Sequence, residues 1–450
     1  MRAALFLALA GATLVGAPRA QAWSNHALVS FWAFRAAPDV AAAPPVAVEP
    51  LESFLKDQEP AIESLLAAQE TWARAHIATY PPRPDALAFR ADPARDDAAR
   101  RKAFVEALRI AANTKFALYA QRQPGDAQDA DRVLKFSDVA TLPEPPLAFY
   151  RFYRLNVGEQ VAPLAVVASA SAEPDFGTDI NCWEDSPSEW GPRYKFGRLP
   201  FGNPAVNITT QAPFHMGFFH QSWIVYKAAP FVARTYPLLR IHQFFGLADL
   251  AFRTGHPYWG WRFAGNALHY VQDLTQPYHA SLLPGASTPR MVWTNVMAVL
   301  GFPRAKNDLI VLVSNRHFAL ERYQVQVVHE ATRQDAKSPA LVALQESARD
   351  AAYPAWSDFY ARDVTAKEAA GFGDRLNDAL LAAAPAHYVS DPAFDFGASG
   401  GHVDLMRILD EGPAARRAAL DAAIAELLGH FGAHSRNLVK GLGPARTAQR

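Results

Sequence analysis

The sequence predicts an all-α protein with long irregular insertions, on the basis of three observations. Apolar residues recur with helical periodicity in seven long segments, whereas the strict alternation of half-buried strands is scarce. No internal repeat is present. The 34 prolines gather in stretches that are typical of connections, at 38–49, 80–85, 143–146 and 183–204. The predicted helical segments are 51–77, 97–121, 222–252, 258–276, 307–332, 340–363 and 411–440.

The first 22 residues have the pattern of a cleavable secretory signal. Arg2 precedes an apolar run over about 3–15, and Ala20 and Ala22 supply the small residues of an A-x-A cleavage site. We expect cleavage after Ala22, a mature chain that begins at Trp23, and export, so that the protein is periplasmic or secreted. No later run approaches the ~20 apolar residues that a membrane span needs.

Charge and cysteine content limit the classes of function. The chain carries 44 basic and 44 acidic residues, and removal of Arg2 and Arg19 with the signal leaves 42 against 44. A nearly neutral mature chain has no broad basic surface to collect nucleic acid, so we expect no stable nucleic-acid partner. Cys182 is the sole cysteine, which excludes an intramolecular disulfide. A large core and bound metal are the two other sources of rigidity.

The stretch HYVQDLTQPYHA, residues 269–280, contains three metal-capable side chains, His269, Asp273 and His279. Residues four apart on a helix lie ~5–6 Å from each other at Cβ, so the first two can share a cation. Pro277 cannot continue the helical hydrogen-bond ladder, so the chain is expected to bend there. The bend leaves the last histidine free to point elsewhere.

A second His–acid pair follows downstream in SNRHFALERY, at His317 and Glu321. At this composition an H-x3-[DE] pair occurs roughly 1.4 times by chance, and His387 with Asp391 is interpreted as such a pair. The extended pattern H-x3-[DE]-x5-H is expected only about 0.04 times. The two motifs together therefore predict a metal centre, and imidazole with carboxylate is a ligand set that suits Zn²⁺.

A helix through 258–276 would place Arg262, Asn266, His269 and Asp273 on one polar stripe and apolar residues on the other side. A lone histidine in such a helix is more often a hydrogen-bonded core residue than a ligand. Only the whole constellation points to a metal.

Signal cleavage would create a further ligand. A free α-amine, with a pKa of about 8, can lose its proton and bind a metal together with its own carbonyl oxygen in a five-membered chelate. Here it would be the amine of Trp23, and His26 follows three residues later in WSNH.

WSNH at the mature start, HYVQDLTQPYHA and HFALE together resemble the zinc-dependent phospholipase C and S1/P1 nuclease superfamily. Members of that superfamily are α-helical and hold three zinc ions, with the amine and carbonyl of an N-terminal tryptophan among the ligands. The match covers 23–36 and about 236–330. It implies a multi-helix phospholipase C/P1 nuclease-like fold in a single domain, 23–450, which follows the signal 1–22 and carries an insertion at about 38–165.

Carried over to this chain, the resemblance implies three Zn²⁺ sites. Trp23 and His26 would bind one zinc, which Asp273 would share with the second. The third zinc would be held by the ends of the two downstream motifs, namely His279, His317 and Glu321.

The second zinc would also take His269 and an upstream Asp/His pair. For the acid, Asp175 in SAEPDFGTD is preferred and Asp179 is the alternative. For the histidine, His215 in PFHMGFF is preferred over His220. The aromatic-rich segment 214–226 around this histidine is interpreted as core, with a cation–π pocket for an alkylated ammonium head group as the alternative.

The resemblance also implies a hydrolytic mechanism. A zinc pair that shares a carboxylate, here Asp273, can lower the pKa of a bridging water and present hydroxide to phosphorus. Asp175 would orient or deprotonate that water. The last acidic ligand, Glu321, resembles the phospholipase branch, whereas the nuclease branch usually has Asp there. The expected activity is therefore phospholipase C-type hydrolysis of phospholipid head-group phosphodiester bonds.

Two other functions remain open. One is an S1/P1-type single-strand nuclease or 3′-nucleotidase, and the other is a secreted binding protein that holds zinc only for stability. The expected partner is a phospholipid or another phosphodiester substrate, together with peripheral contact with a membrane.

Overall fold

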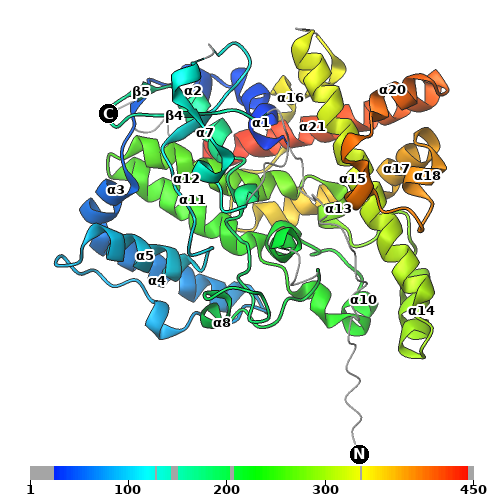
Figure 1. Cartoon of the computed structure of the whole chain (residues 1–450), viewed down its shortest axis with the longest axis horizontal. Coiled ribbons are helices and arrows are strands. Elements are labelled where there is room, and N and C mark those ends of the chain that lie inside the picture. Colours follow the sequence, from blue (N-terminus) through cyan, green and yellow to red (C-terminus); the bar gives the residue numbers. More distant parts are fainter. Residues whose placement is uncertain (1–24, 127–128, 143–149, 203–206, 335–336, 444–450) are drawn as a thin grey trace, which may run out of the picture.

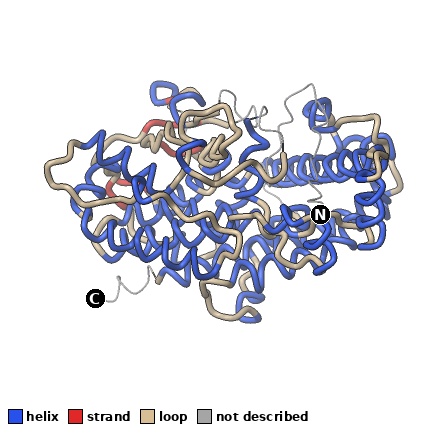
Figure 2. The backbone as a smooth tube through the Cα atoms, turned by 90° about the horizontal axis from the view of Figure 1, so that it is seen from below, coloured by secondary structure: helices blue, strands red, loops and turns tan. Residues whose placement is uncertain are grey.

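The computed structural model describes residues 25–126, 129–142, 150–202, 207–334 and 337–443. These residues are predominantly helical, as predicted, and short strands occur only towards one end of the molecule (Figure 2). The predicted signal and Trp23 lie outside the described residues.

The helices differ widely in length. Those of seven residues or more are α1 (His26–Arg35), α3 (Leu51–Asp57), α4 (Glu59–His76), α5 (Asp97–Leu108), α7 (Pro163–Ala170), α11 (Pro237–Arg253), α12 (Pro257–Asp273), α14 (Thr288–Val299), α15 (Arg304–Arg333), α16 (Pro339–Gln345), α17 (Lys367–Ala383) and α21 (Ala414–Leu442). The shorter ones are α2 (Pro38–Ala41), α6 (Phe136–Val139), α8 (Gly191–Tyr194), α9 (Ala212–His215), α10 (Trp223–Ala228), α13 (Pro277–Ala280), α18 (Ala386–Val389), α19 (Phe396–Ser399) and α20 (Leu405–Asp410).

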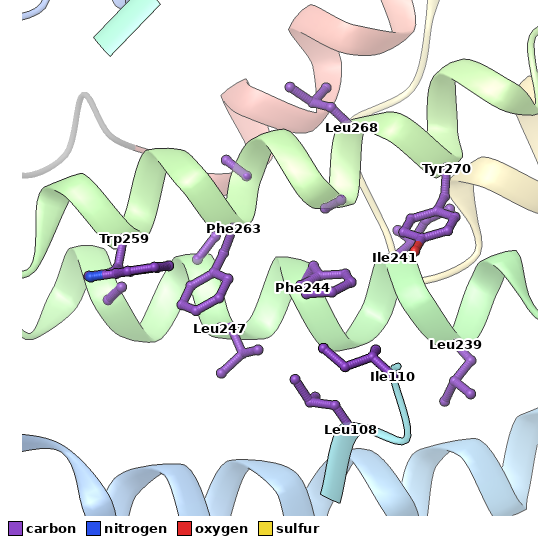
Figure 3. Close-up of a cluster of buried hydrophobic side chains, with 14 of the residues drawn as sticks. Leu108, Ile110, Leu239, Ile241, Phe244, Leu247, Trp259, Phe263, Leu268 and Tyr270 are labelled. Atoms are coloured by element: carbon purple, nitrogen blue, oxygen red, sulfur yellow. The ribbon is translucent and has the colours of Figure 1, made fainter. Parts of the chain in front are cut away.

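The helical hairpin of α11 and α12 forms the centre of the molecule (Figure 1). Helix α12 starts with Pro257 at its first position, where a missing N–H costs nothing. Every residue from Tyr258 to Asp273 is buried, because α7, α11 and α21 pack around this helix. Figure 3 shows Phe244 and Leu247 of α11 against Phe263 of α12. A helix that is covered on all sides can hold polar side chains only where other buried groups satisfy them.

The polar stripe of α12 lies against the buried segment that follows α7. Arg262 forms an ion pair with Glu173 at 2.5 Å, and Asn266 donates to the same carboxylate at 3.0 Å. Further along the stripe, His269 donates from Nδ1 to the Ser171 carbonyl at 2.8 Å. The stripe was predicted correctly, but it faces protein and not solvent.

The predicted insertion, about 38–165, contains all the described strands. Strand β1 (Val46–Ala47) pairs antiparallel with β5 (Gln160–Val161), with Val46 opposite Val161. The other sheet has the order β2-β4-β3 and is antiparallel throughout; its strands are β2 (Tyr119–Gln121), β3 (Val133–Leu134) and β4 (Phe152–Arg154).

The insertion shares its core with the central hairpin. Leu108 and Ile110 lie beneath α11 in the same hydrophobic cluster (Figure 3). Helix α4 packs along α11, and Gln69 donates to the carbonyls of His242 and Gln243 at 3.1 Å each. The boundaries of the domain and of the insertion stay predictions.

The helix predicted over 97–121 was wrong in its second half. Helix α5 ends at Leu108, because Arg109 adopts the left-handed conformation with φ 54°. The chain then returns as strand β2, which pairs Tyr119 with Arg154. Sequence periodicity did not predict this reversal, since the apolar residues after 109 belong to an extended segment.

Three further predicted helices are interrupted. The segment 51–77 divides at Gln58 into α3 and α4. The segment 222–252 divides into α10 and α11. Pro230 lies between the two helices, and Pro237 is the first residue of α11. The segment 340–363 is helical only to Gln345 before shorter helical turns follow. Helices α14 and α17 were not predicted.

The C-terminal half forms a second hydrophobic cluster among α15, α16, α17, α20 and α21. Helix α1 joins the two clusters, since Phe34 packs in the first and Val29 and Trp32 pack in the second. Among the described residues, no helix combines the length and the apolar character needed to cross a membrane.

Candidate metal centre

Three groups of buried His, Asp and Glu side chains could hold metal ions. Their donor atoms within each group lie within 4.8 Å of one another. The groups are His26 with Asp175 and His269; His215 with His269 and Asp273; and His279 with His317 and Glu321. None of these side chains belongs to a residue more than 6 % exposed, so each group is inside the protein.

The first two groups meet at the end of the central helix. Helix α12 supplies His269 and Asp273 from its last turns, and α1 supplies His26 as its first residue. A one-turn 3₁₀ helix, Pro174–Phe176, carries Asp175 into the same space. His215 is the last residue of the short helix α9.

Asp273 lies between the histidines of the two groups. Its Oδ1 is 3.2 Å from Nε2 of His26, while its Oδ2 is 2.8 Å from Nδ1 of His215 and 3.3 Å from Nε2 of His269. Each oxygen of one carboxylate therefore faces a different set of imidazoles. A carboxylate in this position could be shared by two cations, which is the role that the resemblance implies for Asp273.

Asp175 is divided in the same way, at longer distances. Its Oδ2 is 4.0 Å from Nε2 of His26, whereas its Oδ1 is 3.6 Å from Nε2 of His269 and 3.8 Å from Nδ1 of His215. Two carboxylates thus run in parallel between the His26 side and the His215/His269 side of the site.

The histidines are held so that one ring nitrogen points into the site. Nδ1 of His269 donates to the Ser171 carbonyl at 2.8 Å, and Nδ1 of His26 donates to Oε1 of Gln272 at 2.8 Å. With the proton on Nδ1, Nε2 keeps its lone pair on the side of the carboxylates. Such hydrogen bonds fix the tautomer and orientation of metal-ligating histidines.

Close helix packing positions the Ser171 carbonyl. Gly265 of α12 faces α7, and a Cβ at this position would lie 2.5 Å from Cβ of Ala170 and 2.7 Å from the Val167 carbonyl. Only glycine allows α7 to approach this closely. The carbonyl that orients His269 is therefore placed by a glycine one turn earlier on the same helix.

His215 is oriented in the opposite sense by Asp179. Nε2 of His215 lies 3.5 Å from Oδ2 of Asp179, so its Nδ1 faces the site. Asp179 in turn accepts from the Tyr270 hydroxyl at 2.6 Å and from Nε of Arg240 at 2.7 Å. Arg240 is completely buried and also donates to the carbonyls of Leu108 and Arg109.

The structure separates the alternatives that the sequence left open. Asp175 belongs to a metal-capable group, whereas Asp179 stands behind His215. The alternative histidine, His220, is exposed and its Nε2 lies 2.7 Å from the Arg362 carbonyl, away from the three groups.

The third group joins two segments that are 38 residues apart. Helix α12 ends at Asp273 and α13 begins with Pro277, so the predicted bend is present and His279 points away from the α12 stripe. Its Nε2 lies 3.1 Å from Nε2 of His317, which lies 2.5 Å from Oε1 of Glu321 on the next turn of α15. Nδ1 of His279 donates to the His215 carbonyl at 2.9 Å.

Burial favours the neutral form of the two histidines of the third group. It lowers the pKa of His279 to about 3 and that of His317 to about 4, because a charged ring is poorly solvated there. Near neutral pH both rings keep a lone pair for a metal.

The pKa values of the two carboxylates between the first two groups shift in opposite directions. Burial, with the nearby charge of Asp273, raises the pKa of Asp175. For Asp273, burial is outweighed by His269 and by hydrogen bonds from His215 and His26, which hold its pKa well below the usual range.

The pKa values of His215 and His26 are both raised. Burial opposes the charge of His215, but hydrogen bonds to Asp179 and Asp273 outweigh burial and raise the pKa of His215 to about 10. A cation beside Nδ1 of His215 would displace the proton there and stabilise the anionic form of Asp175. The donor set therefore fits cations in physical terms: lone pairs of imidazole and carboxylate oxygens converge where burial disfavours an uncompensated negative charge.

A cavity of about 400 Å³ opens beside the groups. Asp175, His215, His279 and His317 line it at one end. Asp273 is not among its lining residues, so of these two carboxylates only Asp175 faces the cavity. The remaining walls are largely apolar and come from α10, α14, the N-terminal half of α15, and the loops before α9 and after α13.

The residues of the segment 214–226 differ in burial. Phe214 is buried in the core as expected, and Met216 and Phe218 line the cavity. Trp223, by contrast, is 70 % exposed. The interpretation of this segment as core was therefore correct only for its first part.

The orienting residues were not predicted from the sequence. Gln272, Arg240 and Tyr270 each contact a group member or its partner through a hydrogen bond. Arg240, which follows two leucines at the start of α11, is the one signal that could have been noticed, because a buried charge needs a buried partner.

Another cluster of His and Glu side chains lies between α17 and α21. His430 and His434 of α21 are buried next to Glu368 of α17, at 3.4 Å and 2.9 Å. Their donor atoms do not form one of the three metal-capable groups among the described residues.

Comparison with known proteins leaves the site to be interpreted from its own chemistry. No family model, curated protein or solved structure matches this chain.

Proposed function

We propose that this protein is a zinc-dependent phosphoesterase of the phospholipase C type, which hydrolyses head-group phosphodiester bonds of phospholipids. One observation supports this proposal above all: two carboxylates, Asp175 and Asp273, each direct one oxygen to His26 and the other to His215 and His269. A purely structural zinc site is a closed set of four ligands and does not require shared carboxylates beside a cavity.

The residues divide the work in the following way. Zinc ions held by the three groups would supply Lewis acidity and lower the pKa of water. His26, His215 and His269 would bind zinc, each through one ring nitrogen. Gln272, Asp179 and Ser171, respectively, contact the other nitrogen and so orient each ring. Asp175 alone of the bridging pair faces the cavity, so it is placed to orient the attacking water or to take its proton.

The shape of the cavity favours a lipid. Lys306, Ile310, Val313 and His317 recur at intervals of four, three and four along α15 and all line the cavity. Eleven residues of helix span about 16 Å, so an apolar wall of that length separates the metal groups from Lys306. An acyl chain gains by covering such a wall, whereas a nucleotide would bring its charges against it.

Aromatic side chains keep a nuclease as the second candidate. Phe201, Phe218 and Phe318 line the cavity, and aromatic faces can stack on unpaired bases. The local surface supplies little charge for a phosphate backbone, since Lys306 is the one lysine or arginine among the described lining residues.

The decisive experiment combines metal analysis with a substrate panel. Chain purified without added metal is assayed for zinc by mass spectrometry and for hydrolysis of phosphatidylcholine, single-stranded DNA and RNA. Zinc together with release of phosphocholine supports the proposal. Release of nucleotides selects the nuclease, and zinc without hydrolysis, with a loss of stability on chelation, selects a binding protein.

A pair of variants makes the test specific. Asp175→Asn should retain the fold and lose at least about 100-fold in hydrolysis, as for removal of a general base. Asp57→Asn is the matched control, because Asp57 is exposed at the end of α3. Equal activity of Asp175→Asn and the parent would contradict the assignment of Asp175.

A further inference from the structure

Exposed apolar side chains are concentrated in one part of the molecule. Of the eleven large hydrophobic residues exposed in the described chain, eight lie between 223 and 310. The most exposed of these eight are aromatic or leucine side chains: Trp223 at 70 %, Leu300 at 64 %, and Trp293 and Phe302 at 63 % each. We call these four residues the apolar rim. Scattered exposed hydrophobic residues need no explanation, but a concentration of this kind marks an interaction surface.

The rim belongs to the helices that form the cavity. Helix α10, which carries Trp223, packs against α14, which carries Trp293, and α14 packs against α15. The two helices lie at one edge of the molecule (Figure 1). Val225 of α10 and Met291 of α14 line the cavity from the inner sides of the same helices. Ile310 of α15 both lines the cavity and is 46 % exposed, so the cavity reaches the surface near the rim.

The arrangement of α14 is that of an amphipathic helix with an outward apolar face. Trp293 and Val296 are exposed on that face, and Leu300 follows directly after the helix, at the spacing i, i+3, i+7. The inner face holds polar links: Asn295 donates to the Ala228 carbonyl of α10 at 3.5 Å and accepts from Lys306 of α15 at 3.0 Å. The polar groups thus hold the three helices together, and the apolar ones face outward.

The charges around the rim are mainly positive. Lys227, Arg290 and Arg304 are exposed on its helices, and Lys306 lies at the nearby end of the cavity wall. The segments 219–235 and 282–307 contain no Asp or Glu. The next acid along the chain, Asp308, lies 3.8 Å from Arg304, and Asp374 of α17 accepts from the backbone N–H of Gly285.

We propose that the apolar rim docks onto the surface of a phospholipid bilayer, so that the mouth of the cavity faces the lipid. Tryptophans favour the boundary between head groups and acyl chains, and lysines and arginines beside them are attracted to anionic lipids. A second copy of this chain would fit less well, because a symmetric contact would bring the mainly cationic groups of both copies together. The proposal rests on the proposed function, since docking serves to deliver lipid to the metal groups.

Flotation with vesicles tests docking without reference to hydrolysis. The full mature chain is mixed with vesicles of phosphatidylcholine alone, or of phosphatidylcholine with phosphatidylglycerol, at low and high salt. We expect flotation that is stronger with phosphatidylglycerol and weakens with salt. The variant Trp293→Ser/Leu300→Ser should lose at least about tenfold in vesicle partitioning. The control Val157→Ser/Val342→Ser removes exposed apolar groups elsewhere and should float like the parent.

Hydrolysis of two substrate forms then separates docking from catalysis. The rim variant should cleave a short-chain phosphatidylcholine in monomeric solution at the parental rate and cleave vesicles at least about tenfold more slowly. If no lipid is cleaved at all, the proposed function fails, and flotation still decides docking. Flotation of the rim variant equal to that of the parent, or absence of flotation of the parent, overturns docking. A dimer of the parent in sedimentation that the rim variant abolishes would assign the surface to a second copy instead.

Discussion

The guanidinium of Arg240 donates to the carboxylate of Asp179 at 2.7 Å, and both side chains are completely buried. Asp179 is also the group that faces Nε2 of His215. A buried ion pair of this kind adds little stability compared with apolar residues, but loss of one partner is costly. The role of this ion pair is to orient His215: it fixes which ring nitrogen of His215 faces the metal-capable groups.

Asp179→Asn should therefore weaken metal binding although Asp179 contacts no metal. Loss of an orienting partner typically lowers metal affinity about 10- to 100-fold. The variant also leaves Arg240 buried without its counter-charge, which should lower the free energy of unfolding by about 3–5 kcal/mol. Competition with a chromophoric chelator measures the first effect and urea unfolding the second.

A matched control is Asp249→Asn, which removes an exposed partner of Arg253 on the same helix as Arg240. This change should cost less than about 1 kcal/mol and leave metal binding unaltered. Unchanged zinc affinity in Asp179→Asn, with lower stability, would reduce Asp179 to a purely structural residue.

Substitution of Asp273 and of Glu321, two of the three acidic group members, should remove different numbers of ions. Asp273 stands between two sets of histidines, so Asp273→Asn should retain about one of three expected zinc ions. Glu321 belongs only to the third group, so Glu321→Gln should lose about one. Mass spectrometry of the purified variants gives the counts. Glu368→Gln, beside His430 and His434, is the control and should leave zinc content unchanged; equal losses in Asp273→Asn and Glu321→Gln would speak against bridging.

Gly265→Ala should damage the site from outside it. The new methyl group cannot fit between α12 and Ala170, so α7 must move and carry the Ser171 carbonyl away from His269. We expect a loss of about 1–3 kcal/mol in stability, and weaker zinc binding. Gly371→Ala on α17 is the control: a Cβ there has open space, and alanine should be neutral or stabilise by about 0.5–1 kcal/mol.

The ion pairs between Asp350 and the last helix, α21, should make the free energy of unfolding depend on pH in the acid range. Partial burial opposes the charge of Asp350, but hydrogen bonds from Arg436 and Lys440 of α21 outweigh it and lower the pKa of this carboxyl. A lowered pKa in the folded state stabilises the protein above the unfolded pKa of about 3.9, and this contribution is lost as pH falls through the folded value. Asp350→Asn should thus be less stable than the parent in urea at neutral pH, and the difference should vanish in stronger acid. A difference that is constant with pH would contradict the ion pair.

The His26 side of the site should depend on the mature N-terminus. Within the described residues this side has one histidine of its own, together with oxygens of Asp175 and Asp273. The sequence predicts that the Trp23 amine completes it. A chain with an extra Met before Trp23 should therefore bind less zinc and lose most of the proposed phosphodiesterase activity, compared with a chain that starts at Trp23. Equal zinc content and turnover in both would exclude the amine as a ligand.

The parts of the site that depend on local geometry were predictable. His269 and Asp273 share a face because helical residues four apart do so, and Pro277 separates α12 from α13 because it cannot extend the ladder. The same applies to His317 and Glu321. The convergence of His279 with His317 was predicted only because a shared ion accounts for both motifs.

The parts that depend on distant segments were not predictable. Asp175 and Asp179 stand four residues apart in one loop, and only the buried Arg240 and Tyr270 show that Asp179 belongs behind His215. Gln272 gave no sequence signal because its partners, His26 and the Ser435 hydroxyl, come from opposite ends of the chain. The strand after Arg109 was missed for a similar reason, since its partner strand lies more than 30 residues later.

The pairing of Val46 with Val161 has a consequence for how this protein could change during evolution. A segment whose two ends lie side by side can in principle be exchanged or shortened without disturbing the rest of the chain. Here the carbonyls of Leu108 and Arg109, deep within that segment, accept from the arginine that supports Asp179. An ancestor that lacked the segment would have needed other acceptors for Arg240 or another residue in its place. Position 240 and the segment 46–161 are therefore expected to be gained or lost together among relatives of this chain.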